Sequence, residues 1–134
     1  MSLEADIELR NLLISDDELT SKVKPENIIV GWTKAPTEYP CIVIVQTGGE
    51  DIGMLGYGTA AEGSKPWRER ITWQINIYST NSRKETLEIA DRIREILFAS
   101  DGVYWKTSDV DTYEANLHAY RKIITWTRIR LDND

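Results

Sequence analysis

Cys41 and His118 are the residues of this sequence most suited to nucleophilic chemistry, and each is the only residue of its type. Acyl transfer by such a pair requires the thiol and the imidazole to touch. Cys41 begins the apolar run Cys41–Val45 and has no polar neighbour in it, which favours a buried thiol. One cysteine and one histidine can form neither an internal disulfide nor a Cys/His metal site. We therefore predict that the chain is not an enzyme and has no catalytic or metal-binding residue.

The segment Gly58–Gly63 has the glycine spacing of a phosphate-binding loop. That motif continues with Lys and then Ser or Thr at the start of a helix, because the lysine reaches the phosphates. Here Ser64 and Lys65 are followed by Pro66, so the order is wrong. We predict no nucleotide and no other cofactor.

Asp109, Asp111 and Glu114 form a group of carboxylates, but the segment lacks the full ligand pattern and turn glycine of an EF-hand. A solvated acidic turn is expected. Tryptophan rings could stack on bases, yet a net charge of −6 and a pI near 4.9 oppose binding to a polyanion. We predict no sequence-specific nucleic-acid binding, and we assign packing roles to Trp32, Trp67, Trp73, Trp105 and Trp126.

The composition places these residues in one folded domain, residues 1–134. A content of 41% hydrophobic and 28% charged residues is too apolar for a disordered tail. No stretch approaches 18 uncharged apolar residues, and charged residues are frequent from Glu4 to Arg10, which excludes a spanning helix and a secretory signal. No membrane partner is expected, and a cytosolic protein is the starting expectation.

Three helices are predicted. Apolar residues at helical spacing indicate the first over residues 4–14. The capping box Ser15–Glu18 opens a short second helix to about Val23, and the capping box Ser82–Glu85 opens a long one over 83–99.

Strands are predicted at 28–30, 41–45, 69–78, 103–105 and 120–131. The run 41–45 does not alternate, which is typical of a central strand covered on both faces. In 69–78 the apolar residues alternate with polar ones, which predicts one buried face. The order helix, helix, three strands, helix, two strands predicts an α+β fold, with a mixed or largely antiparallel sheet and helices packed on one face.

A long glycine-rich loop is predicted over residues 48–66, which hold six of the eight glycines. Loops of this length are uncommon in compact domains unless they are functional or disordered. The loop also holds apolar residues that a flexible linker does not need. Two placements fit them equally well: they fold back on their own core, or they form an interface with another subunit. The residues are Ile52, Met54, Leu55 and Tyr57.

The arrangement as a whole resembles the tail terminator or tail completion proteins of long-tailed bacteriophages and prophages. The resemblance rests on the N-terminal helix with its capped turn, on Tyr39-Pro40 ahead of Cys41–Val45, and on Arg70–Ser79 running directly into the helix 83–99. It spans nearly the whole chain and involves no catalytic residue.

The resemblance implies an α+β domain that caps the tail tube as a ring, commonly a hexamer, and stops tube growth. The implied partners are copies of the chain itself, the tail tube protein and a head connector or head completion protein. The implied location is the host cytoplasm during assembly and then the virion tail. Because ordering the loop 48–66 costs conformational entropy, we also expect that the isolated chain can stay monomeric and form its ring only on a tube. Two alternatives stay open: a head-side adaptor of the same junction, and a small cytosolic ligand-binding protein.

Overall fold

The computed structural model describes residues 3–31, 38–54, 67–100 and 103–131. Its elements follow the predicted order, with one short 3-10 turn added. The helices are α1 (Leu3–Ile14), α2 (Asp17–Lys22), η1 (Pro25–Asn27) and α3 (Arg83–Ala99). The strands are β1 (Ile28–Val30), β2 (Cys41–Met54), β3 (Trp67–Ser79), β4 (Tyr104–Glu114) and β5 (Ala119–Leu131).

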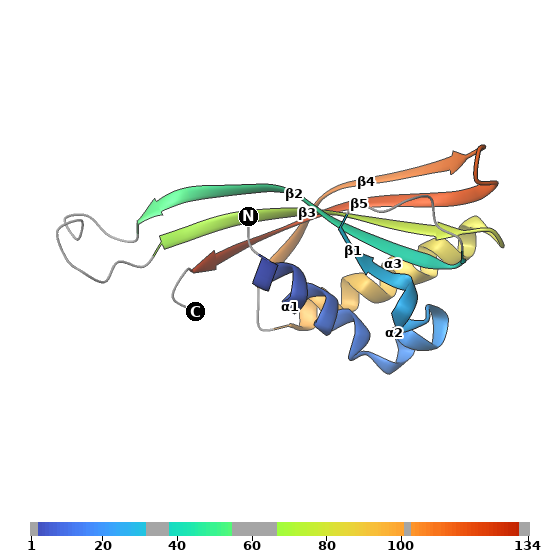
Figure 1. Cartoon of the computed structure of the whole chain (residues 1–134), viewed down its shortest axis with the longest axis horizontal. Coiled ribbons are helices and arrows are strands. Elements are labelled where there is room, and N and C mark those ends of the chain that lie inside the picture. Colours follow the sequence, from blue (N-terminus) through green and yellow to red (C-terminus); the bar gives the residue numbers. More distant parts are fainter. Residues whose placement is uncertain (1–2, 32–37, 55–66, 101–102, 132–134) are drawn as a thin grey trace.

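The five strands form one mixed sheet in the order β1-β2-β3-β5-β4. The β1 strand is parallel to β2, and the other neighbours are antiparallel. The helices lie on one side of the sheet (Figure 1), so the predicted α+β fold is confirmed. No helix within the described residues is both long and apolar enough to cross a membrane.

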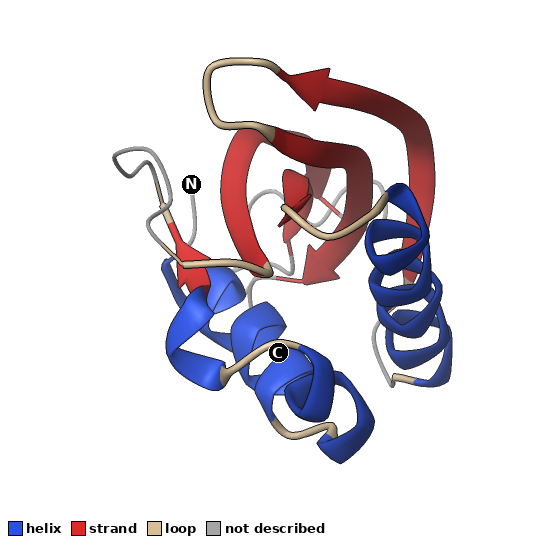
Figure 2. Ribbon diagram, turned by 90° about the vertical axis from the view of Figure 1, so that its right-hand side faces the viewer, coloured by secondary structure: helices blue, strands red, loops and turns tan. Residues whose placement is uncertain are grey.

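The core lies between the helices and the apolar face of the curved sheet (Figure 2). The predicted alternation in β3 is confirmed, because the four apolar side chains of that face are fully buried. Opposite them on β5 lie Ile124, paired with Ile75, and Trp126, paired with Trp73. The helices contribute buried residues that include Leu9, Leu13, Leu19, Ile89, Ile93 and Leu97.

The predicted central strand is also confirmed. The side chains of Cys41–Val45 are all buried, and β1 and β3 flank this part of β2 on its two sides. A strand covered on both faces has no polar face to alternate with, which explains its uninterrupted apolar sequence.

Helix capping differs from the prediction in its details. Ser82 caps α3 as expected, accepting a hydrogen bond from the Glu85 amide at 3.1 Å. The Glu85 carboxylate, however, accepts from the Ser79 hydroxyl at 2.6 Å. At α2 the predicted cap was wrong by one residue: Asp16 accepts from the Leu19 amide at 2.8 Å, because Ser15 is occupied by the carbonyl at the end of α1.

The predicted loop over residues 48–66 was wrong at its start. The strand β2 continues to Met54, and its residues pair with β3 from Gly48 opposite Thr72 to Met54 opposite Trp67. Irregularities in the ladder at Gln46/Gly48 and Asp51/Met54 accommodate the unfavourable strand residues of this segment. Residues 55–66, including Gly58–Gly63, lie outside the described residues.

The strand predicted over 103–105 is much longer, and the acidic turn predicted at Asp109, Asp111 and Glu114 is wrong. All three carboxylates lie within β4, which extends from Tyr104 to Glu114. Aspartate is unfavourable in strands, but here β5 supplies both the backbone ladder and the cations that bind these carboxylates.

Candidate functional site

The most distinctive feature of the molecule is a projecting arm, which we define as Gly48–Met54 of β2 and Trp67–Arg70 of β3. It extends away from the helices, which lie under the middle and the opposite part of the sheet (Figure 1). Its two strands are joined by an antiparallel ladder with one irregularity, between Asp51 and Met54, and by an ion pair of 3.6 Å between Arg70 Nη1 and Glu50 Oε2. The far side of β3 pairs with β5 as far as Leu131. The arm is therefore supported along one edge.

Along its other edge the arm has no neighbouring strand within the described part of the chain. The strand β1 pairs with β2 at Ile42–Ile44 alone, and no other described strand lies beside β2. An unpaired strand edge offers a row of backbone N–H and C=O groups to an additional strand. This edge of the arm is therefore a candidate site for an additional strand.

The four predicted interface residues fall on or next to this arm. Ile52 and Met54 belong to β2 and are thus strand residues. Leu55 and Tyr57 lie outside the described residues. Whether these four side chains contact a neighbouring subunit stays a prediction.

The two residues suited to nucleophilic chemistry occupy unfavourable positions for it. Cys41 is 1% exposed, and burial raises the pKa of its thiol to about 12, so the thiol stays protonated near neutral pH. His118 is exposed in the turn between β4 and β5, with a left-handed φ of 51°. The described residues contain no group of three or more His, Cys, Asp or Glu arranged to hold a metal ion.

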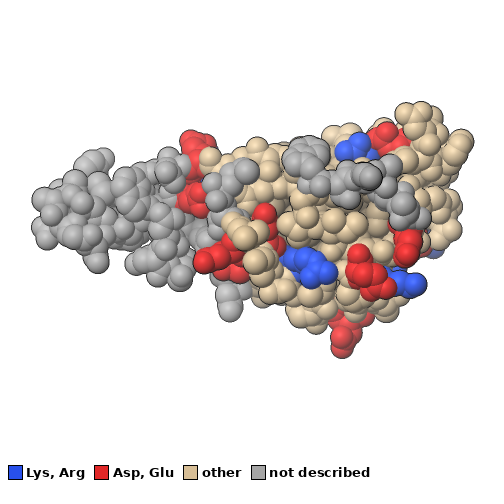
Figure 3. Space-filling model, in the orientation of Figure 1, with Lys and Arg blue, Asp and Glu red and all other residues tan. Residues whose placement is uncertain are grey.

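Tryptophan packing is confirmed for the residues whose surroundings are described. Trp73 and Trp126 are fully buried, whereas Trp105 is half-buried. On the face shown in Figure 3, basic side chains of the described residues alternate with acidic ones and form no stripe. Such a surface lacks the electrostatic pattern of a nucleic-acid groove.

A partly buried ion pair that the sequence did not reveal joins the start of α2 to α3. Arg92 donates to both carboxylate oxygens of Asp16, at 2.6 and 2.8 Å, and also contacts Glu18 and Glu95. The hydrogen bonds from Arg92 hold the pKa of Asp16 below its ordinary value. Asp16 and Arg92 lie 76 positions apart in the sequence, so no local spacing indicates this pair.

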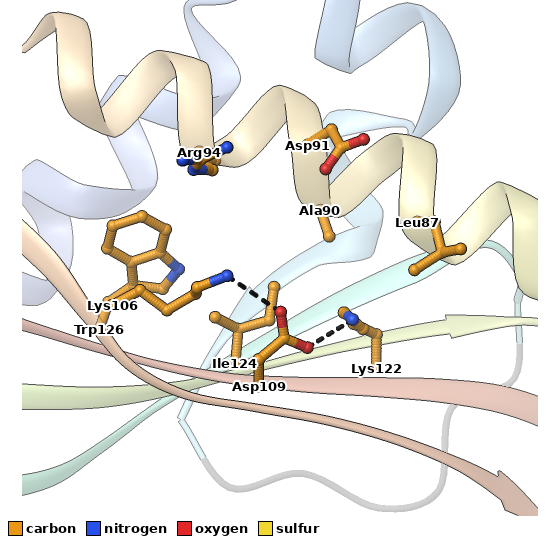
Figure 4. Close-up of a pocket in the computed structure, with 9 residues that line it drawn as sticks. All are labelled: Leu87, Ala90, Asp91, Arg94, Lys106, Asp109, Lys122, Ile124 and Trp126. Atoms are coloured by element: carbon orange, nitrogen blue, oxygen red, sulfur yellow. Dashed lines mark hydrogen bonds and ion pairs between the residues drawn. The ribbon is translucent and has the colours of Figure 1, made fainter.

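A second charged cluster ties β5 to β4 beside a small cavity (Figure 4). Lys122, whose side chain is 9% exposed, contacts the carboxylates of Asp109 and Asp111. Lys106 also binds Asp109, at 3.0 Å. The cavity has a volume of about 40 Å³. Ligand pockets measure roughly 300–1,000 Å³, so this space suits water rather than a metabolite.

Acid should weaken the fold, because the pKa of Asp16 is lowered by its pairing with Arg92. Asp16 has a lower pKa in the folded chain than in the unfolded chain, where it is near 3.8. Its carboxylate therefore stabilises the fold at pH values above 3.8, and this stabilisation is lost as the pH falls through the pKa of the folded chain. We expect Asp16→Asn, which keeps an oxygen for the helix cap, to cost about 1–3 kcal/mol at pH 7. Its unfolding free energy should also depend less on pH between 5 and 2, the range set by carboxylate titration.

Urea unfolding at a series of pH values checks this expectation. The control is Asp17→Asn, because Asp17 is exposed and directly follows Asp16 as the first residue of α2. Identical pH profiles for the two variants would show that the Asp16–Arg92 pair contributes nothing to acid sensitivity.

Comparison with known proteins gives a consistent result for the fold. No protein-family model matches the sequence, and no curated protein matches it. Among solved structures, a chain from the virion of a native gene transfer agent particle aligns over 96% of this chain and 93% of its own length, with a TM-score of 0.61 and 11% identity. The bacteriophage SPP1 gp17 protein aligns over 95% of this chain and 88% of its own, with a TM-score of 0.57 and 17% identity.

The two similar structures define the class of fold to which this chain belongs. It is an α+β fold found in proteins of phage and gene transfer agent particles, matched over nearly the whole chain in both cases. The fold implied by the resemblance to tail terminator and tail completion proteins is thereby confirmed.

Proposed function

We propose that this chain is a structural protein of a phage or phage-derived particle, acting at the junction of head and tail. There it caps the tail tube as a ring, stops tube growth and presents a surface for joining to the head. The observation that carries the proposal is the shared fold, which extends over almost the full length of two particle proteins. The absence of a catalytic arrangement among the described residues fits a role in assembly.

The distribution of charge supports a ring of identical subunits. Residues 1–62 hold eleven acidic and four basic residues, a net charge of −7, whereas residues 63–134 hold eleven and twelve, a net charge of +1. A ring made from identical copies joins two unlike surfaces of each copy. The projecting arm and the charge difference supply unlike surfaces.

Tube growth is the direct test. Tail tube protein is polymerised with and without the purified chain, and tube lengths and tube ends are examined by electron microscopy. We expect shorter tubes of a limiting length, each with a ring at one end. A chain that binds head connectors and leaves tube growth unchanged would be the head-side adaptor. A chain that binds neither would contradict a role at this junction.

Cys41 and His118 should be dispensable for this role. We expect Cys41→Ala to cost about 1 kcal/mol of stability, since a small apolar group replaces a buried thiol, and His118→Ala to cost less. Both variants should cap tubes as well as the original chain in the same assay. A variant with an unchanged melting curve that fails to cap would restore the case for chemistry at that residue.

A further inference from the structure

The strand β4 is an edge strand that is exposed on both of its faces. Its residues from Lys106 to Tyr113 are all exposed, and β5 is its one neighbour among the described strands. Two of these residues are apolar: Val110 is 49% exposed and Tyr113 is 51% exposed. Long exposed edges with apolar side chains are sites where another strand can add.

Bulges and uncompensated charges usually protect such an edge from further pairing. In β4 the bulge affects only one part of the strand, and the charges are bound by the chain's own sheet. The one ladder irregularity between β4 and β5 lies between Lys106 and Ser108. Asp109 and Asp111 contact Lys122 of their own sheet (Figure 4 shows Asp109), so their charges are already compensated. From Asp109 to Glu114 the pairing with β5 is regular. The outer side of this segment is thus a regular template for a further strand.

A complementary edge exists on the opposite side of the same sheet. It is the outer edge of β2 from Gly48 to Met54, which belongs to the arm and has no neighbouring strand among the described residues. The arm and the turn between β4 and β5 lie toward opposite ends of the molecule (Figure 1). Glu50 of the arm contacts Arg70, and the acidic residues of β4 contact Lys122 or Arg121, so these carboxylates are compensated within their own sheet. If the β4 edge of one copy pairs with the β2 edge of the next, the contact joins two different surfaces. Such a heterologous contact can be repeated from copy to copy and can close into a ring.

We propose that β4, over Asp109–Glu114, pairs with the outer edge of the arm of a second copy, so that the sheet continues across the subunit interface. This inference rests on the proposed ring and names the surfaces that form it. Pairing covers Val110 and Tyr113 and uses the backbone groups that no described strand pairs along either edge. The occupant of the β4 edge is therefore another molecule of this chain.

Self-association of the free chain tests the pairing. Sedimentation velocity is measured over a range of concentrations, together with amide hydrogen exchange. We expect the mass to rise above 15.4 kDa with concentration. Exchange should slow about tenfold, equivalent to 1.4 kcal/mol, in β4 and in the arm.

Two substitutions at matched exposure make the test specific. Val110→Lys places a charge on the β4 edge, whereas Ile7→Lys does so on α1, where Ile7 is 50% exposed. The first should weaken association about tenfold, and the second should leave it within about twofold. If Val110→Lys lowers the melting temperature, Thr112→Lys at a neighbouring exposed position replaces it.

Three results would overturn the pairing: a chain that stays monomeric up to about 1 mM, association without protection of β4, or equal effects of the two lysine variants. Tube growth separates this inference from the proposed function. If Val110→Lys caps tubes normally, the interface lies elsewhere while the capping role stands. If the unaltered chain fails to cap, the function itself is wrong.

Discussion

Replacing Trp73 by alanine should lower the free energy of unfolding by about 3–5 kcal/mol, the range for removing a large aromatic side chain from a core. Trp73 is fully buried in β3, faces Tyr104 at a ring distance of 5.9 Å and pairs in the ladder with Trp126. Its indole N–H also donates to Asp6 of α1 at 2.9 Å. The substitution therefore leaves a cavity and removes a connection between the sheet and the first helix.

Thermal and urea unfolding measure this loss, with Trp105→Ala as the control. Trp105 is half-buried on β4, so its removal should cost clearly less. The variant Trp73→Phe keeps an aromatic ring in the core but lacks the N–H group that donates to Asp6. Comparing it with Trp73→Ala separates the loss of packing from the loss of the hydrogen bond. A melting curve of Trp73→Ala that matches the unaltered chain would contradict the central position of this residue.

Replacing Met54, Leu55 and Tyr57 together by serine should abolish tube capping and leave the fold almost unchanged. In the proposed interface, the apolar side chains of Met54, Leu55 and Tyr57 would supply contact area for a neighbouring subunit or for the tube once water is excluded. Exposed substitutions outside a core usually change stability by less than about 0.5 kcal/mol. The expected result is an unaltered melting temperature combined with tubes that grow as if no cap were present.

The control for this triple variant carries serine at three exposed apolar positions away from the arm. Leu3, Ile7 and Val103 are 73%, 50% and 69% exposed. This control should cap tubes normally. Normal capping by the arm variant, or equal failure of both variants, would remove the end of the arm from the proposed interface.

Local patterns in the sequence were enough to predict the elements that carry the core. The helix 83–99 was predicted with its observed bounds, because a cap at Ser82 and an apolar stripe with a period near 3.6 both act over a few residues. The buried face of β3 followed from strict alternation, since a shift of one residue would expose every large side chain on it. The resemblance to tail terminator proteins used the same strand and helix.

Contacts between distant parts of the chain decided what the sequence left open. Residues 48–54 form a strand because β3 lies beside them, and glycine content alone predicted a loop. Asp109 and Asp111 belong to a strand because Lys122, on a different strand, compensates their charges. Sequence spacing contains no information about such partners, since only the folded sheet brings them together. The open edges of β2 and β4 likewise exist only once the strand order is set.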